Sequence, residues 1–233
     1  MNMKRRWLAF CRRAGARGQA EEAFAELDRR YREPGRHYHT WAHVASCLRE
    51  LRRARPQAGE TAALELAVWF HDAVYEPGRG DNEEVSAQLA LRWALVLGLA
   101  PALGGRAAGL ILATRHEQPS PPRTDPAEVL LRDIDLAVLG ARRARYLRYE
   151  RGIAREYAGV PPADFREGRA HLLRGFLARP ALYSTPAFRR RLEPRARRNL
   201  ARAVTRLTGR PLAPLERGRL IGRPGGPEAR PGP

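Results

Sequence analysis

The stretch TAALELAVWFHDAVY, residues 61–75, decides how this chain folds. Apolar side chains would occupy almost every face of a helix built from it, which is typical of a central helix packed on several sides. The same stretch carries an adjacent histidine and aspartate, His71 and Asp72. On a helix these side chains diverge by about 100° around the axis, yet one ion placed over that edge can bind both. Burying such a pair costs free energy unless a partner satisfies it. We therefore predict a central helix whose polar pair faces a cation.

The remainder of the chain up to Gly209 is expected to be helical. Apolar side chains recur at helical spacing in segments such as 17–32 and 106–116, and we find no alternating strand pattern of any length. The sequence therefore predicts an all-α fold. Capping and helix-breaking residues delimit the expected helices: Pro34-Gly35, Thr40, Asp81 with Glu84 as a capping box, Asp125-Pro126, Gly140, Pro180, Pro186 and Pro194.

Length and composition indicate one domain followed by a tail. The 233 residues can bury a sizeable core. After Gly209 the composition changes to mostly Pro, Gly and Arg, which cannot bury enough apolar surface to offset its ordering entropy. We expect a helical domain over residues 1–209 and a disordered basic tail over 210–233.

The chain is expected to be a soluble cytoplasmic protein. No apolar run reaches the length of a membrane span, and the apolar residues 7–10 form too short a stretch for a signal peptide. Cys11 and Cys47 are the two cysteines and lie far apart, so they form no disulfide framework.

The formal net charge of +18 comes almost entirely from arginine spread along the whole chain. We find no Lys/Arg block interleaved with aromatic residues and no zinc-finger spacing, so we do not expect nucleic acid as the main ligand. Guanidinium groups also bind phosphate in a bidentate manner. A site rich in arginine could therefore equally receive an anionic small molecule.

Histidines and aspartates near the central stretch form a candidate metal site. If Thr40 caps a helix, His39 lies just before it and His43 lies in its first turn, so both imidazoles can point into one cavity. Asp133 and Asp135 follow on a later apolar stretch, and helical periodicity does not choose between them because both have apolar neighbours three or four residues away. Imidazole and carboxylate are ligands that borderline and hard divalent cations prefer. A single buried His-Asp pair can also be a hydrogen-bonded core pair, but this clustering favours a metal site.

The order His, His-Asp, then a distant Asp on an all-helical chain resembles the HD-domain superfamily of metal-dependent phosphohydrolases. The segment YHTWAH, residues 38–43, is similar to the Tyr-His-Asn-x-x-His segment of cyclic nucleotide phosphodiesterases, which share that helical core. More closely, the chain resembles a bacterial family of predicted HD-type phosphohydrolases. The matching segments, which extend from about residue 20 to residue 205, are YHTWAHV, ELAVWFHDAVYEP, DNEEVSA, ILATRHE, DIDLAVLG, YERGIAREY and FLARPALYSTPAF.

This resemblance implies an HD-domain helical bundle that binds a divalent cation, with Mn, Mg, Fe, Zn, Co and Ni all open. The ligands it implies are His43, His71, Asp72 and a closing aspartate. Asp135 is favoured over Asp133, because it precedes a leucine as the last ligand does in related phosphodiesterases. His39 matches the phosphodiesterase general acid, a role that suits a side chain whose pKa lies near the working pH.

Other residues are candidates for the site, each with a plainer alternative. Glu84 could orient the attacking water or only complete the capping box with Asp81. His116 could bind a second metal or a substrate phosphate, or be a solvated loop histidine. Arg36 and Arg115 are candidate phosphate clamps, and Asp133 is kept as a candidate substrate contact. The segment 73–76 lacks the histidine that phosphodiesterases carry after the HD pair, so neither a two-metal site nor cyclic nucleotide specificity follows.

The expected function is metal-dependent hydrolysis of a phosphate ester, for example of a nucleotide. The cation would activate water for in-line attack, and His39 would protonate the leaving group. The alternative is a non-catalytic HD protein that binds a nucleotide or acts as a regulator. Binding of nucleic acid through the arginine surface is a third hypothesis, and it would show steep salt dependence.

Overall fold

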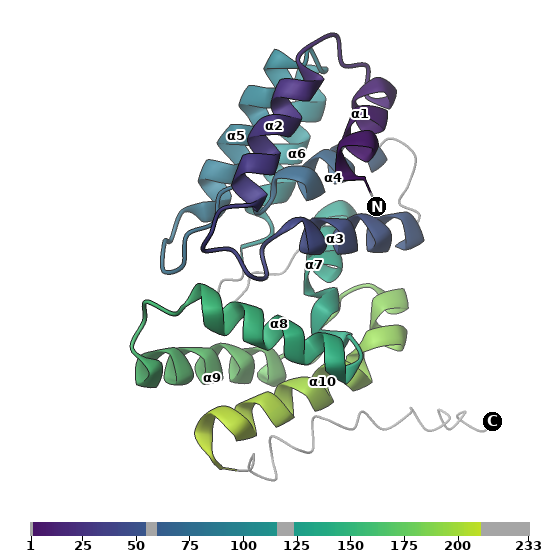
Figure 1. Cartoon of the computed structure of the whole chain (residues 1–233). Coiled ribbons are helices and arrows are strands. Elements are labelled where there is room, and N and C mark those ends of the chain that lie inside the picture. The colour runs from purple at the N-terminus through teal and green to yellow at the C-terminus, as the bar shows by residue number, and fades with distance from the viewer. Residues whose placement is uncertain (1, 55–59, 116–123, 211–233) are drawn as a thin grey trace, which may run out of the picture.

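The computed structural model describes residues 2–54, 60–115 and 124–210, and this part of the chain is helical without any strand (Figure 1). The predicted all-α fold is therefore confirmed. His116 and residues 211–233 of the expected tail lie outside the described residues. The helices are α1 (Met3–Arg13), α2 (Ala20–Tyr31), α3 (Trp41–Ala54), α4 (Thr61–Phe70), α5 (Asn82–Val96), α6 (Pro101–Leu112), α7 (Pro126–Asp135), the 3-10 helix η1 (Leu136–Gly140), α8 (Arg143–Glu156), α9 (Pro162–Ala178) and α10 (Pro186–Thr208).

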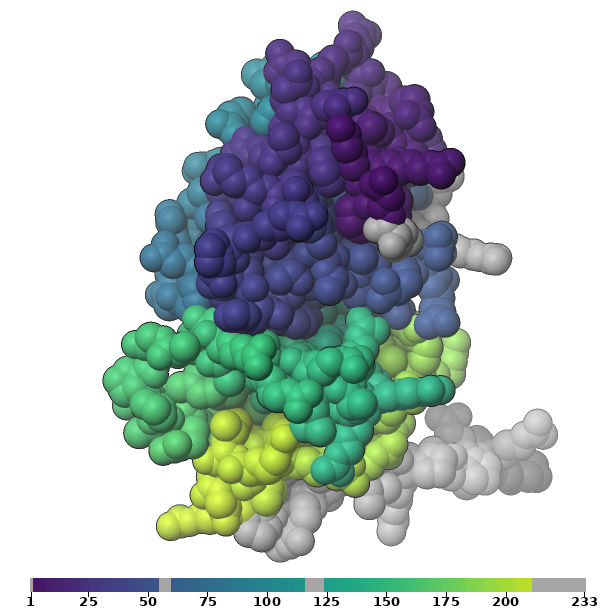
Figure 2. Space-filling view, viewed as in Figure 1, coloured from purple at the N-terminus to yellow at the C-terminus, as the bar shows by residue number. Residues whose placement is uncertain are grey.

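The helices form two groups joined by α3 and α7. Helices α1, α2, α4, α5 and α6 lie together at one end of the molecule, and α8, α9 and α10 lie at the other (Figure 1). The second group packs directly against the first in the space-filling view (Figure 2). One continuous core runs through both groups, from Trp7 and Trp69 to Leu173 and Leu200. Among the described residues, no helix combines the length and the apolar character needed to cross a membrane.

Helix α1 (Met3–Arg13) lies in a segment for which no separate helix was delimited from the sequence. Its Trp7, Phe10 and Cys11 follow the i, i+3, i+4 pattern of an amphipathic helix, and all three are buried. The indole of Trp7 lies edge-on to Trp69 at 5.4 Å between ring centroids, and its Nε1 donates a hydrogen bond to the Ala20 carbonyl. Helix α1 therefore packs against α4 and completes the core around it.

Helix α4 ends at Phe70, so the predicted helix over residues 61–75 was too long. Side chains from distant segments form hydrogen bonds with the backbone groups of the residues that follow the helix. The guanidinium of Arg36 donates to the carbonyls of Asp72 and Ala73, and the Ser86 hydroxyl bonds both the N–H and the carbonyl of Val74. The chain therefore turns at His71-Asp72, and this pair does not lie on regular helix as we had expected.

Other helix boundaries confirm some predicted signals and correct others. The Asp125 carboxylate accepts hydrogen bonds from two N–H groups in the first turn of α7, as predicted. Asp81 makes no capping bond to α5, because its side chain pairs with Arg79, so the predicted capping box was wrong. Pro194 lies inside α10 and does not break it as expected. Helix α10 ends at Thr208, and the following Gly209 adopts a left-handed conformation with φ of 67°.

Alanine substitutions at two glycines, Gly140 and Gly105, test the packing. A Cβ at Gly140 would lie 2.6 Å from the Leu192 Cβ and 3.0 Å from the Leu192 carbonyl oxygen, whereas a Cβ at Gly105 would meet nothing within 4 Å. We expect Gly140→Ala to lower the free energy of unfolding by about 1–3 kcal/mol through overpacking. Gly105→Ala, on an exposed face of α6, should raise it by up to about 1 kcal/mol. Denaturant unfolding measures both, and changes of the same sign would contradict this account of the packing.

Candidate metal centre

Three helices bring four predicted ligands to one point. His43 lies in the first turn of α3, His71 and Asp72 follow the end of α4, and Asp135 is the last residue of α7. The Nε2 atoms of His43 and His71 are 3.0 Å apart. The His43 Nε2 also lies 3.1 Å from Asp135 Oδ1 and 3.2 Å from Asp72 Oδ2. The turn after α4 places Asp72 Oδ2 only 3.1 Å from His71 Nε2, so the pair faces a common point.

A fifth side chain, Cys47, joins this cluster. It lies one turn after His43 on the same face of α3, and its Sγ is 3.5 Å from His43 Nε2. His43, Cys47, His71 and Asp135 each offer one ligand atom within 4.8 Å of the others, and such a group could hold a metal ion. Cys47 was not among the candidate ligands predicted from the sequence. Its i, i+4 spacing from His43 was the available signal.

Charges in the cluster shift one another's pKa. Burial by itself lowers the pKa of His43 and His71, but the neighbouring Cys47, Asp72 and Asp135 raise both well above their usual range. Burial raises the pKa of Asp72, but His71 and His39 lower it well below its usual value. The imidazoles must be neutral to bind a cation, so metal binding at this site releases protons.

Backbone groups fix the orientation of the central pair. The Nδ1–H of His71 donates to the Val68 carbonyl at 3.1 Å, which leaves the Nε2 lone pair directed at the cluster. Arg36 bonds the carbonyls of His39, Asp72 and Ala73, and its side chain is only 3% exposed. Arg36, which we had considered as a phosphate clamp, thus ties the His39 loop to the turn after α4.

His39 lies beside the cluster and forms a dyad with Glu156. Its Nδ1 is 2.8 Å from Glu156 Oε2, and its ring stacks on Tyr75 at 3.7 Å between centroids. The other carboxylate oxygen of Glu156, Oε1, accepts hydrogen bonds from the backbone N–H groups of residues 37, 38 and 39. Burial raises the pKa of Glu156, but its bonds to His39 and to these N–H groups bring the net pKa below its usual value. No local sequence pattern indicates a role for Glu156, because it contacts residues 117 to 119 positions away.

The structure separates Asp133 from Asp135. Asp133 Oδ1 accepts the N–H of Ser184, and Oδ2 accepts both the N–H and the hydroxyl of Thr185. These bonds hold the segment that leads into α10, and burial raises the pKa of this carboxyl. Asp135 therefore joins the candidate centre, whereas Asp133 supports the fold elsewhere and is placed neither as a ligand nor as a substrate contact.

Arg115 and Glu84 pair with each other and do not line the cavity beside the cluster. Arg115 also donates to the Gly80 carbonyl. Their roles as phosphate clamp and water-orienting group gain no support from this placement. The neighbouring Glu83, which was not a candidate from the sequence, lines the cavity instead.

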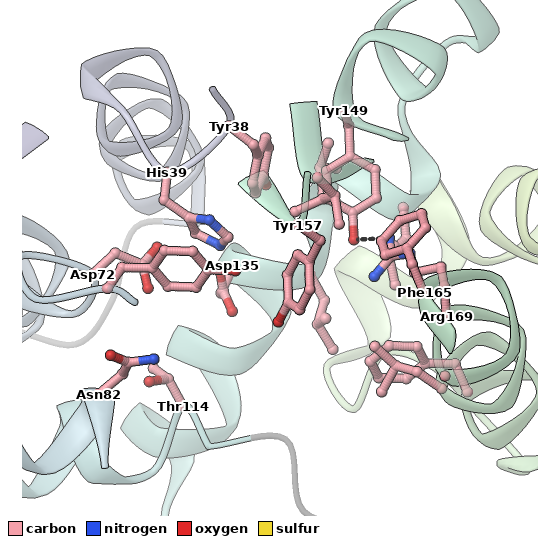
Figure 3. A pocket seen from close by; sticks show the side chains of 18 of the residues that line it. Tyr38, His39, Asp72, Asn82, Thr114, Asp135, Tyr149, Tyr157, Phe165 and Arg169 are labelled. Atoms are coloured by element: carbon pink, nitrogen blue, oxygen red, sulfur yellow. Dashed lines mark hydrogen bonds between the residues drawn. The ribbon is translucent and has the colours of Figure 1, made fainter. Parts of the chain in front are cut away.

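A cavity of about 370 Å³ opens beside the cluster. At one end it is lined by His39, His71, Asp72 and Asp135, and at the other by aromatic and aliphatic side chains from the α8–α9 region (Figure 3). Among its described lining residues, Arg169 is the single Lys or Arg. Its Nη2 donates to the Tyr149 hydroxyl and to Glu150, and its Nε is buried without a partner. The carboxylates on the wall are Asp72, Glu83, Asp135 and Asp164.

Comparison with known proteins finds no matching family model, no matching curated protein and no matching solved structure. The resemblance to HD-domain phosphohydrolases therefore stays a prediction, and the candidate centre rests on its geometry.

Asparagine variants at the two aspartates test the assignment of the closing ligand. Asp135→Asn should reduce the metal bound per chain by more than about tenfold, because an amide is a poorer ligand than a carboxylate. Asp133→Asn should keep its metal and lose about 1–3 kcal/mol of unfolding free energy, because its amide N–H₂ would face backbone donors. Elemental analysis and denaturant unfolding of both variants distinguish the two roles. The reverse pattern would make Asp133 the ligand.

Proposed function

We propose that this protein is a metal-dependent phosphohydrolase of the HD-domain type that cleaves a phosphate ester. The observation that carries the proposal is the convergence of His43, His71, Asp72 and Asp135 beside a cavity that His39 also lines. The helical fold and the order of these residues along the chain also support it. A divalent cation held by these side chains would polarise a phosphoryl oxygen and lower the pKa of bound water.

His39, which lines the cavity beside the cluster, would transfer a proton to the leaving oxygen. Because Glu156 is a buried acceptor, the His39 Nδ1 carries a hydrogen, and Nε2 is the ring nitrogen left for the substrate. In the imidazolium form, the Glu156 carboxylate stabilises the positive charge, and Nε2–H is the donor for general acid catalysis. Stacking on Tyr75 fixes the ring plane. Glu156 is thus a positioning residue that acts through His39.

The cavity favours a small substrate with one phosphate and an uncharged body. Its volume of about 370 Å³ is at the small end of ligand sites. Arg169 is already paired with Glu150, so the described wall offers little positive charge for further phosphates. Aromatic rings instead cover the end away from His39; they are Tyr149, Tyr157, Phe165 and Phe176. A nucleoside or aryl monophosphate fits this class better than a triphosphate does.

The test is hydrolysis by metal-stripped and metal-reloaded protein across a panel of phosphate esters. We expect turnover only after reloading, and a kcat/KM at least about tenfold higher for a nucleoside or aryl monophosphate than for the matched triphosphate. The variant His39→Gln should keep its metal content but lower kcat by about 10²-fold or more.

Two results would contradict the proposal. Metal binding without turnover of any ester would favour the non-catalytic nucleotide-binding or regulatory protein. Hydrolysis that persists in His71→Ala after its metal is lost would show that the activity does not come from this centre.

A further inference from the structure

The thiol of Cys47 contacts His43 within the cluster. Cys47 is 2% exposed and does not line the cavity. Asp72 and Asp135 do line it, and their side chains are 19% and 18% exposed. An ion held by the cluster would therefore meet sulfur on the core side and carboxylates on the side where substrate enters.

The distances suit coordination of one ion by sulfur and nitrogen. For a tetrahedral ion with bonds of about 2.3 Å to sulfur and about 2.05 Å to nitrogen, the two ligand atoms are about 3.6 Å apart. The separation between Cys47 Sγ and His43 Nε2 is 3.5 Å. Two nitrogen or oxygen ligands would be about 3.3 Å apart by the same geometry, close to the 3.0 Å and 3.1 Å from His43 Nε2 to His71 and Asp135. Small side-chain movements would complete the set.

The second cysteine shows that burial by itself does not create this environment. Cys11 is equally buried, at 2% exposure, but it packs in α1 beside aromatic rings. Burial raises the pKa of its thiol to about 12. Cys47 instead faces the cluster, with its Sγ 3.5 Å from His43 Nε2. It belongs to a group of four side chains whose ligand atoms lie within 4.8 Å of one another.

We propose that Cys47 joins His43, His71, Asp72 and Asp135 as a metal ligand, and that its sulfur makes the centre prefer Zn²⁺ or Co²⁺ over Mg²⁺ and Mn²⁺. Thiolate favours softer ions, whereas carboxylate and water suit the harder ones. This inference rests on the metal centre of the proposed function, but it does not depend on hydrolysis.

Cobalt spectroscopy of the full-length protein tests the inference without any variant. Metal-free protein is titrated with Co²⁺ and its near-ultraviolet absorption is recorded. We expect a sulfur-to-cobalt charge-transfer band that saturates at one ion per chain. Binding of Co²⁺ without this band would overturn the role of Cys47 and leave the proposed function standing. If the band appears but the protein hydrolyses no ester, Cys47 is supported as a metal ligand and the proposed function is contradicted.

The variants Cys47→Ser and Cys11→Ser form a matched pair, since each removes one buried thiol. Cys47→Ser should lose the cobalt band and weaken Zn²⁺ binding by at least about tenfold, with little change for Mn²⁺. Cys11→Ser should keep the band and the preference for Zn²⁺. An unchanged ratio of Zn²⁺ to Mn²⁺ affinity in Cys47→Ser, or loss of the band in Cys11→Ser, would overturn the proposal.

Discussion

The burial of His71, beside the partly exposed Asp72, at the end of the most apolar helix is the constraint on which the rest of the structure depends. Polar groups at this depth cost several kcal/mol unless they are satisfied, and distant parts of the chain satisfy them. The Val68 carbonyl accepts a hydrogen bond from the His71 ring. The Arg36 guanidinium donates hydrogen bonds to the carbonyls of Asp72 and Ala73 in the turn. His43 and Asp135 then complete the surroundings from α3 and α7. The packing of α3, α4 and α7 against one another is therefore also what assembles the candidate centre.

Sequence patterns predicted the features that depend on local periodicity. The all-α fold, the cap at Asp125 and the end of α10 before Gly209 follow from residue spacing and are confirmed. The ligand set was also proposed from the sequence, and the structure brings His43, His71, Asp72 and Asp135 together. Their binding of a cation, like the resemblance to HD-domain phosphohydrolases, stays a prediction.

Features set by contacts between distant segments could not be predicted. Helix α4 stops early because Arg36 and Ser86 bind the backbone of the following turn. Asp133 and Asp135 have equivalent apolar neighbours in the sequence, so helical periodicity does not separate them. The resemblance favoured Asp135; in the structure Asp133 bonds the segment before α10, whereas Asp135 faces His43. Glu156 reaches the His39 loop from the end of α8, across more than a hundred residues. No local pattern contains this information.

The structure also changes the interpretation of the basic composition. A net charge of +18 suggested arginines that clamp phosphate, yet the cavity wall carries more carboxylates than guanidinium groups among its described residues. Several buried arginines instead bond backbone carbonyls. Arg36 holds the turn after α4, and Arg197 donates to three carbonyls at the end of α9 and just beyond it. Part of the charge therefore stabilises loops, and a cation at the His-Asp cluster would supply the positive charge that a phosphate needs.

The most direct test of this account is a crystal structure of the metal-loaded protein, with anomalous scattering recorded at the absorption edge of the bound element. The account predicts one anomalous peak about 2.0–2.3 Å from the Nε2 atoms of His43 and His71 and from a carboxylate oxygen of Asp135. A peak located elsewhere, or imidazoles of His43 and His71 directed toward separate regions, would contradict it.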